Sequence, residues 1–298
     1  MNNGAAHLGL LIVNIIYAVS YGISKDVMDE YIPPFPFILI RILGATLLFW
    51  LLSRIVKSDK VEKKDFGRLA LCGLFGVAAN QLMFFEGLNN TISINASSIM
   101  VGTPLIVLIL SFFMLGERIS PRKFAGVCVG MLGALMIIFS DKGSGSQSIY
   151  GDLLILLNAS SYGFYLVLVK PLMRKYNPLT VIRWSFTFGL LFALPFGLSG
   201  ISEINWNLDL AAVAKVSFII FAMTFLTYLL TVYCLGRVSP TVVSAYIYLQ
   251  PILATIIALY YGTETLTLEL VLYASFIFIG VFLVSLPSKL AKSPPKLA

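Results

Sequence analysis

Apolar residues gather into ten stretches of about 20 residues, separated by short polar segments. A helix of that length crosses the ~30 Å hydrocarbon core of a bilayer, whereas strands of a membrane barrel show about ten residues of alternating polarity. The pattern therefore predicts an all-α integral membrane protein with ten transmembrane helices. We expect these helices at about residues 6–24, 35–54, 67–86, 92–115, 122–140, 150–170, 177–197, 211–233, 239–261 and 268–287.

Two of the stretches share one internal pattern. Residues 97–117 read SSIMVGTPLIVLILSFFMLGE and residues 244–264 read SAYIYLQPILATIIALYYGTE, so each has a proline inside it and a glutamate at its end. A shift of 147 residues aligns them without a gap, and shifts of 141 and 142 residues align shorter motifs upstream. We therefore predict two repeats joined by a polar Gly/Ser loop, with the boundaries 1–140 (first repeat), 141–149 (loop), 150–288 (second repeat) and 289–298 (basic tail).

Each predicted repeat contains five spans, which is an odd number, so the second repeat enters the membrane inverted relative to the first. Inverted repeats are typical of secondary transporters, whose substrate site lies near the midplane where the repeats meet. A duplication can also build a membrane protein that transports nothing. A transporter and a non-transporting scaffold are both compatible with the repeat alone.

The composition agrees with a membrane protein. The chain is 58% hydrophobic and 12% charged, with a mean hydropathy of +0.91, whereas soluble domains have about 25% charged residues. Its net charge of +7 has a topological meaning, because most of the Lys and Arg residues fall in alternate loops. The positive-inside rule then places both termini in the cytoplasm and predicts a multi-pass protein of the inner membrane that binds lipid rather than nucleic acid.

Polar side chains inside the predicted spans indicate where a cavity lies, because such groups are costly against lipid. They recur at helical spacing, and the repeat shifts carry Tyr17 onto Asn158 and Asn80 onto Thr227. A threonine can instead bond its own helix, a tyrosine can lie at the membrane interface, and an asparagine can join two helices. The predicted substrate-binding residues are Asn14, Tyr17, Tyr21, Asn80, Gln81, Ser97, Asn158, Tyr162, Tyr165, Thr227, Tyr228, Ser244 and Tyr248.

The two repeat-related prolines, Pro104 and Pro251, are predicted hinges. A proline inside a helix removes one backbone hydrogen bond and clashes with the carbonyl four residues earlier, here that of Met100 or Ile247. We expect the freed carbonyls to serve as acceptors in a cavity and each helix to bend at its proline. A static kink that only improves packing is the alternative.

Two arginines, Arg41 and Arg183, lie at equivalent positions near the starts of two spans. An arginine near a helix end can extend its guanidinium to the membrane surface, and we expect this of Arg183. Arg41 has a candidate partner, because Glu86 lies at a similar outer depth on the next predicted span. We predict a gate in which the Arg41–Glu86 pair forms in one state and separates in another.

The motif of small residues, a proline within the helix, an apolar stretch and a final glutamate resembles the EamA-type exporters of the drug/metabolite transporter superfamily. It occurs as ASSIMVGTPLIVLILSFFMLGE and again as YLQPILATIIALYYGTE. The resemblance implies a basket of ten helices with both ends cytoplasmic. It also implies that helices 1, 3, 4, 6, 8 and 9 surround the transport path, while helices 5 and 10 are peripheral.

The fifth predicted span, with GVCVGMLG at 126–133, has small residues at helical intervals. Such residues permit close approach of two helices, which indicates internal packing or a dimer contact. The protein is accordingly expected to be a monomer or a weak homodimer.

An enzyme would need an acid–base or metal constellation at bilayer depth. The sequence has no His, Asp or Glu near the middle of a predicted span, and its three cysteines (Cys72, Cys128 and Cys234) lack metal-ligand spacing. We therefore predict no enzyme activity, no metal and no cofactor. The prediction is a secondary transporter that moves a small polar or amphipathic, amino-acid-like metabolite outward by alternating access, with a channel or a scaffold as the alternatives.

Overall fold

The computed structural model describes residues 4–56, 58–90, 99–117, 119–140, 149–250, 252–253, 256 and 268–286. Helices and short turns account for these residues, and no strand occurs among them. The first half contains α1 (Gly4–Glu30), α2 (Pro34–Ile55), η1 (Lys63–Asp65), α3 (Phe66–Gly73), η2 (Leu74–Ala78), α4 (Ala79–Asn90), α6 (Thr103–Leu115) and α7 (Pro121–Ser140). The second half contains α8 (Ile149–Val169), η3 (Leu172–Arg174), α9 (Pro178–Leu198), η4 (Ile201–Glu203), α10 (Leu210–Phe218), η5 (Ile219–Leu226), α11 (Thr227–Leu235), α12 (Pro240–Ala245), η6 (Tyr246–Tyr248) and α14 (Leu268–Ser285).

The prediction of an all-helical membrane protein is confirmed. Among the described residues, helices long and apolar enough to cross a membrane are Gly4–Glu30, Pro34–Ile55, Lys63–Leu88, Ile149–Arg174, Pro178–Leu198 and Leu210–Leu235. Two shorter apolar helices are Ile99–Leu115 and Val271–Ser285. The count of ten spans stays a prediction, because these last two helices are shorter than expected.

Prolines and polar caps explain where several helices begin. Proline occupies the first turn of α2, α9 and α12, where the missing N–H costs nothing because that position has no helical partner. Asn177 and Asp209 cap α9 and α10, and their side chains accept hydrogen bonds from the backbone N–H of Thr180 (2.8 Å) and Ala212 (2.6 Å). These caps fix the loop ends from which the spans start.

The same helix pairings occur in both halves. Helix α1 packs on η5 and α11 as α8 packs on η2 and α4, and α2 packs on η5 as α9 packs on η2. Helices α6 and α7 pack together, as do α12 and α14. This correspondence is what a two-fold relation between two copies of one repeat produces.

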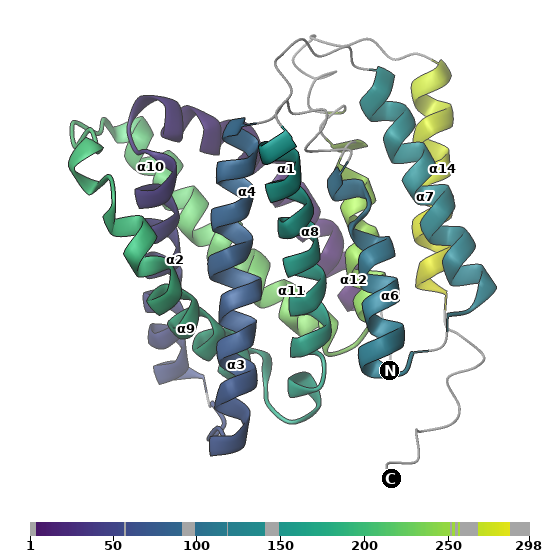
Figure 1. The fold of residues 1–298 in the computed structure, drawn as a ribbon, viewed down its shortest axis with the longest axis horizontal. Coiled ribbons are helices and arrows are strands. Elements are labelled where there is room, and N and C mark those ends of the chain that lie inside the picture. Colours follow the sequence, from purple (N-terminus) through teal and green to yellow (C-terminus); the bar gives the residue numbers. More distant parts are fainter. Residues whose placement is uncertain are drawn as a thin grey trace.

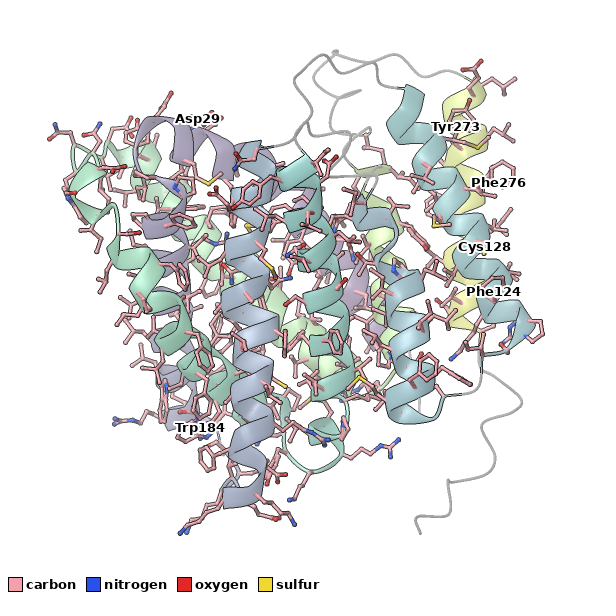
Figure 2. The ribbon with its side chains drawn as sticks, viewed as in Figure 1. Asp29, Phe124, Cys128, Trp184, Tyr273 and Phe276 are labelled. Atoms are coloured by element: carbon pink, nitrogen blue, oxygen red, sulfur yellow. The ribbon has the colours of Figure 1, made fainter. Side chains whose placement is uncertain are left out.

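Helices α7 and α14 form a closely packed pair at one edge of the molecule (Figures 1 and 2). A Cβ atom placed on Gly280 would lie 2.5 Å from the Cα of Gly130, and one on Gly133 would lie 2.7 Å from the carbonyl oxygen of Tyr273. Only glycine allows the two backbones this close. The small residues of the fifth predicted span therefore serve internal packing, and the pair takes the peripheral place expected of it.

Two π-helical segments occupy repeat-related positions, which the sequence pattern did not predict. The shift of 147 residues carries η2 into η5, so both repeats widen the same helix at the same depth. Side chains from neighbouring helices bond carbonyls in η2: the Ser161 hydroxyl donates to Phe75 (2.7 Å) and the Tyr228 hydroxyl donates to Gly76 (3.1 Å). Such bulges are frequent at functional sites.

The fourth predicted helix breaks at Gly102, and α6 begins with Pro104 in its first turn. The Thr103 hydroxyl donates to the Met100 carbonyl over 2.6 Å. The expectation that Met100 offers a free acceptor is therefore wrong, because the residue before the proline supplies the missing donor. Pro251 lies outside the described residues, and the 3-10 turn η6 precedes it. Both hinge roles remain predictions.

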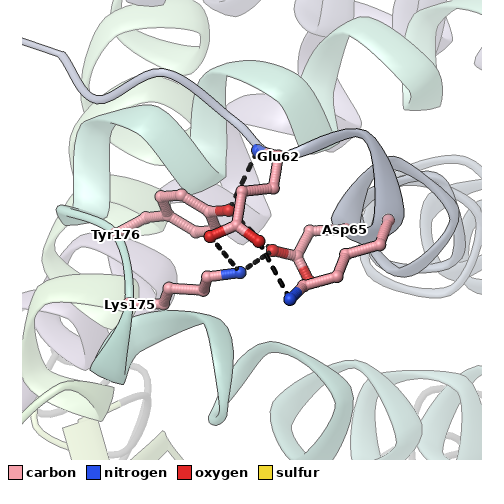
Figure 3. Close-up of polar contacts among 5 residues, drawn as sticks. Glu62, Asp65, Lys175 and Tyr176 are labelled. Carbon is pink, nitrogen blue, oxygen red and sulfur yellow. Dashed lines mark hydrogen bonds and ion pairs between the residues drawn. The ribbon is translucent and has the colours of Figure 1, made fainter.

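A cluster of charged and polar groups joins the two repeats at one end of the bundle (Figure 3). Lys175 pairs with Glu62 (2.7 Å) and Asp65 (2.6 Å), the Tyr176 hydroxyl donates to Asp65 (2.6 Å), and the Glu62 backbone N–H donates to the Tyr176 oxygen (3.1 Å). We call this set of four residues the inter-repeat clasp. It joins the segment before α3 to the segment before α9, at the end predicted to face the cytoplasm.

The contacts shift the pKa values of the clasp in opposite directions. The hydrogen bond from Lys175 lowers the pKa of Glu62, and the bonds to Asp65 and Glu62 raise the pKa of Lys175. Glu62 therefore contributes stability above the ordinary glutamate pKa of about 4.3 and loses it as pH falls through its lowered pKa. Lys175 contributes below the ordinary lysine pKa of about 10.4 and loses its contribution as pH rises through its raised pKa.

Substituting Lys175→Gln should loosen the clasp at neutral pH, and hydrogen exchange of the segment 58–65 should rise. The control is Lys64→Gln, because Lys64 pairs with Glu62 (3.0 Å) within the same segment and is largely exposed. The difference between wild type and K175Q should disappear at a pH low enough to protonate both Glu62 and Asp65, because Lys175 pairs with each of them. Equal exchange in K175Q and K64Q would show that the clasp does not hold the two segments together.

Candidate substrate-binding cavity

A cavity of about 120 Å³ lies between helices of both repeats. Polar side chains from α1, α4, α8 and α11 form much of its wall, together with apolar groups and one arginine from α2. The lining residues are Leu10, Val13, Asn14, Tyr17, Arg41, Asn80, Gln81, Phe84, Phe85, Met100, Asn158, Tyr162, Met223, Tyr228, Thr231, Val243, Ile247 and Gln250.

The structure brings many of the predicted binding residues together at this cavity. They come from positions up to 214 residues apart (14 to 228), so only the helix packing makes them neighbours. The predicted residues in the wall are Asn14, Tyr17, Asn80, Gln81, Asn158, Tyr162 and Tyr228. Ser97 and the side chain of Tyr21 lie outside the described residues.

Four predicted binding residues do not line the cavity. Tyr165 and Tyr248 are fully buried and pack on Gly76 and Gly130, and the Tyr248 hydroxyl donates to the Val127 carbonyl (3.1 Å). The hydroxyls of the remaining two bond carbonyls of their own helices, which was one of the alternatives for such residues: Thr227 to Met223 (2.5 Å) and Ser244 to Thr241 (3.1 Å).

The helical spacing by which we predicted the binding residues assumes a regular α-helix with 3.6 residues per turn. Tyr248 follows two residues of the 3-10 turn η6, and Thr227 follows the π-segment η5 directly. A 3-10 turn has 3.0 residues per turn instead of 3.6, so each residue rotates roughly 20° further about the helix axis than in an α-helix. Tyr248, inside the 3-10 turn, accordingly packs on Gly130, whereas Gln81 and Tyr228, just beyond η2 and η5, line the cavity as predicted.

Gln250, Thr231 and a set of apolar residues were not among the predicted binding residues. Gln250 is a polar residue within an apolar span and could have been found by the same rule as the others. The apolar wall residues, such as Phe84, Phe85 and Met223, carry no such signal, because apolar side chains occupy lipid-facing and core positions alike.

The amide side chains in the wall are held in defined orientations. Asn14 donates to the Leu10 carbonyl (2.8 Å), and Gln250 donates to the Asn14 side-chain oxygen (3.2 Å). Asn158 donates to the Asn80 carbonyl (2.6 Å). These bonds hold the amides of Asn14, Gln250 and Asn158 in defined orientations.

Arg41 is 2% exposed and lines the cavity. Its Nε donates to the Thr224 hydroxyl (3.2 Å), and its guanidinium carbon lies 5.4 Å and 5.1 Å from the ring centroids of Phe37 and Phe85. Such cation–π contacts stabilise a desolvated cation by about 2 kcal/mol. Within the described part of the chain, no carboxylate forms an ion pair with Arg41.

The predicted Arg41–Glu86 pair is not formed in this structure. Glu86 instead accepts a hydrogen bond from the side chain of Asn90 (3.0 Å), one turn further along α4. Arg183, the repeat mate of Arg41, donates to the Ser58 hydroxyl (3.2 Å) and lies over the ring of Trp50 (4.4 Å). Ser58 lies in the segment between α2 and η1, and Arg183 is buried, so the expected extension to the membrane surface stays a prediction.

A sequence profile of the EamA-like transporter family matches residues 4–139 and again residues 149–286. The chain belongs to the EamA-like transporter family. The two matches cover nearly all of it, so the resemblance seen in the two proline motifs is confirmed.

Relatives of this EamA protein are transporters by name. An uncharacterized transporter of Archaeoglobus fulgidus is 30% identical over 268 residues, which cover 87% of this chain and 89% of the relative. The uncharacterized transporter YoaV of Bacillus subtilis is 23% identical over 280 residues, covering 93% and 95% of the two chains. A solved structure entitled "Crystal structure of protein" has a TM-score of 0.77 at 16% identity and covers 95% of this chain and 97% of that one; it supports the fold alone.

The described residues of this EamA protein contain no group of three or more His, Cys, Asp or Glu side chains that could hold a metal ion. The polar side chains of the cavity wall are amides, phenols, one threonine and one guanidinium. Such groups bind a solute by hydrogen bonds and charge.

Tyr162 and Tyr165, three residues apart on α8, should respond differently to substitution by alanine. Tyr162 lines the cavity, so Tyr162→Ala should raise the substrate concentration for half-maximal transport about 2- to 10-fold, as expected for an aromatic contact of ~0.5–1.5 kcal/mol. Tyr165 is buried against Gly76, so Tyr165→Ala should lower the unfolding free energy by about 3–5 kcal/mol. Thermal unfolding and transport kinetics check the pair; a loss of stability in Y162A with normal transport in Y165A would reverse the assignment.

Proposed function

We propose that this protein is a secondary transporter of the inner membrane that moves a small polar or amphipathic, amino-acid-like metabolite outward by alternating access. The observation that carries the proposal is a polar cavity enclosed between two copies of the EamA repeat. Polar groups inside a membrane bundle are costly unless they meet one another or a bound solute. A cavity built from them is therefore a place for a polar solute.

The size and charge of the cavity favour a small solute. Its volume of about 120 Å³ is close to the ~150 Å³ of an engineered protein cavity that holds benzene. Its wall includes a single charged residue, Arg41. A phosphorylated sugar or a nucleotide is too large for a cavity of this volume and carries more negative charge than one arginine neutralises.

The two ends of the molecule offer contacts that alternating access would break in turn. The inter-repeat clasp lies at the predicted cytoplasmic end. At the opposite end the Asn205 backbone N–H donates to the Tyr31 carbonyl (2.8 Å), and Lys215 pairs with Asp26 (3.0 Å). The Arg41–Glu86 pair of the predicted gate, which is not formed here, would form in another state of the cycle. No Asp, Glu or His lines the described cavity, which favours facilitated movement or exchange over tight proton coupling.

A transport screen on protein reconstituted into liposomes tests the proposal. Neutral polar metabolites loaded inside should leave faster than from protein-free liposomes, at a rate that saturates with concentration because each molecule must occupy the cavity. Transport of sugar phosphates without any neutral metabolite would contradict the substrate class. A flux that rises linearly without saturation would favour a channel, and no flux of any solute would favour a scaffold.

A further inference from the structure

Three polar atoms of the cavity-lining residues have no hydrogen-bond partner among the described residues. They are Nη1 of Arg41, the side-chain oxygen of Gln81 and the side-chain oxygen of Asn158. The three residues are 2%, 4% and 2% exposed. More than nine in ten buried polar groups in proteins have a partner. Other atoms unpaired within the described part of the chain, such as the hydroxyls of Ser185 and Thr241, lie away from the cavity, whereas these three line it, where a solute would satisfy them.

The orientation of both amides is fixed by their neighbours. The Asn158 NH₂ group donates to the Asn80 backbone carbonyl (2.6 Å), which can only accept, so the other end of the amide is its oxygen. The Tyr228 hydroxyl donates to the Gly76 carbonyl (3.1 Å), so its oxygen can accept from the Gln81 NH₂ group at 3.5 Å. The two unpartnered amide atoms are therefore acceptors.

Arg41 has the opposite need, because its unpaired atom is a hydrogen-bond donor. A guanidinium has five N–H donors and no acceptor, and here Nε is bonded to Thr224 while Nη1 is unbonded within the described part of the chain. The phenol groups of Tyr17 and Tyr228 lie near the same charge. A buried cation without a counterion is strongly destabilising, so Arg41 offers a negative group both a charge and free donors.

The donor and the acceptors without partners come from different helices, with Arg41 on α2, Gln81 on α4 and Asn158 on α8. The acceptors come from α4 and α8, which pack on each other. The repeat mates of Asn158 and Gln81 are Tyr17 and Tyr228, the phenols beside Arg41. At each of these two pairs of equivalent positions, one repeat therefore supplies an amide and the other supplies a phenol.

We propose that the cavity is a two-pole site for a zwitterion, in which Arg41 binds the carboxylate of a small amino acid and the side-chain oxygens of Gln81 and Asn158 bind its ammonium group. This inference rests on the proposed transport function and narrows its substrate class. A carboxylate accepts two N–H bonds from a guanidinium, and an ammonium group has three donors for amide oxygens. Both poles of the solute thereby satisfy groups that are otherwise unpaired.

Matched ligands test the two poles separately on the purified wild-type protein. The panel comprises L-alanine, L-leucine and L-phenylalanine, each with the amine that lacks its carboxylate and the acid that lacks its ammonium group. At least one amino acid should raise the thermal unfolding midpoint, because a ligand that binds only the folded state stabilises it. Its matched amine and matched acid should both stabilise the protein less. Equal stabilisation by either analogue, or none by any of the three amino acids, would overturn the proposal.

Variants assign each pole to its residue. Arg41→Gln should weaken binding of the amino acid ~10- to 100-fold, as expected for a charge-assisted hydrogen bond, and should abolish its advantage over the amine. Asn158→Leu should abolish its advantage over the acid. Arg183→Gln is the matched control, because this repeat mate bonds Ser58 and lies outside the cavity wall; it should leave the order of the three ligands unchanged. The same loss in R183Q and R41Q would refute the assignment.

Transport by the same wild-type preparation separates this inference from the proposed function. Liposomes loaded with the amino acids are compared with liposomes loaded with glycerol and xylitol, which are polar and uncharged. Efflux of the amino acids supports both proposals. Efflux of glycerol or xylitol without any amino acid would overturn the two-pole site while a transporter of polar metabolites remains, and efflux of none of these solutes would contradict both.

Discussion

The constraint behind this structure is that every polar group at bilayer depth must find its partner inside the protein. The chain meets it first with helices, which pair the backbone internally. It then uses side chains for the exceptions: Ser161 and Tyr228 bond carbonyls of the widened segment η2, and Thr103 bonds the carbonyl that Pro104 leaves without a donor. Three of the groups that remain unpaired among the described residues, on Arg41, Gln81 and Asn158, line the central cavity, where a polar solute can pair with them.

Much of the fold could be predicted from the sequence, because apolar runs and repeated motifs are direct records of membrane spans and duplication. The proline motifs, set in two repeats of five predicted spans, indicated the EamA family, and seven predicted polar residues line one cavity. Tyr165 and Tyr248 were placed in the site because polarity alone cannot distinguish a tyrosine at a cavity from one that fills a space beside a glycine. The glycines Gly76 and Gly130 were the missing signal, since their partners are far away in the chain.

The pattern of apolar and polar residues did not predict where the helices depart from regular α-helical geometry. Nothing in the residues of η2 or η5 distinguishes a π-segment from an α-helix, yet each changes the hydrogen-bond pattern of its helix. Arg41 shows the same limit: its depth suggested an outer gate, whereas packing against Phe37 and Phe85 holds it at the cavity. The two repeats share their helix arrangement but differ in side chains at equivalent positions. Tyr17 corresponds to Asn158, and Gln81 corresponds to Tyr228.

The central claim is that the cavity between the repeats is reached from both sides of the membrane. Thiol labelling at a wall position tests it most directly. Thr231 is 4% exposed and lines the cavity, so Thr231→Cys in a variant without Cys72, Cys128 and Cys234 places one thiol there. A membrane-impermeant maleimide should label it in both right-side-out and inside-out vesicles. Labelling from one side only, or from neither, would contradict the account.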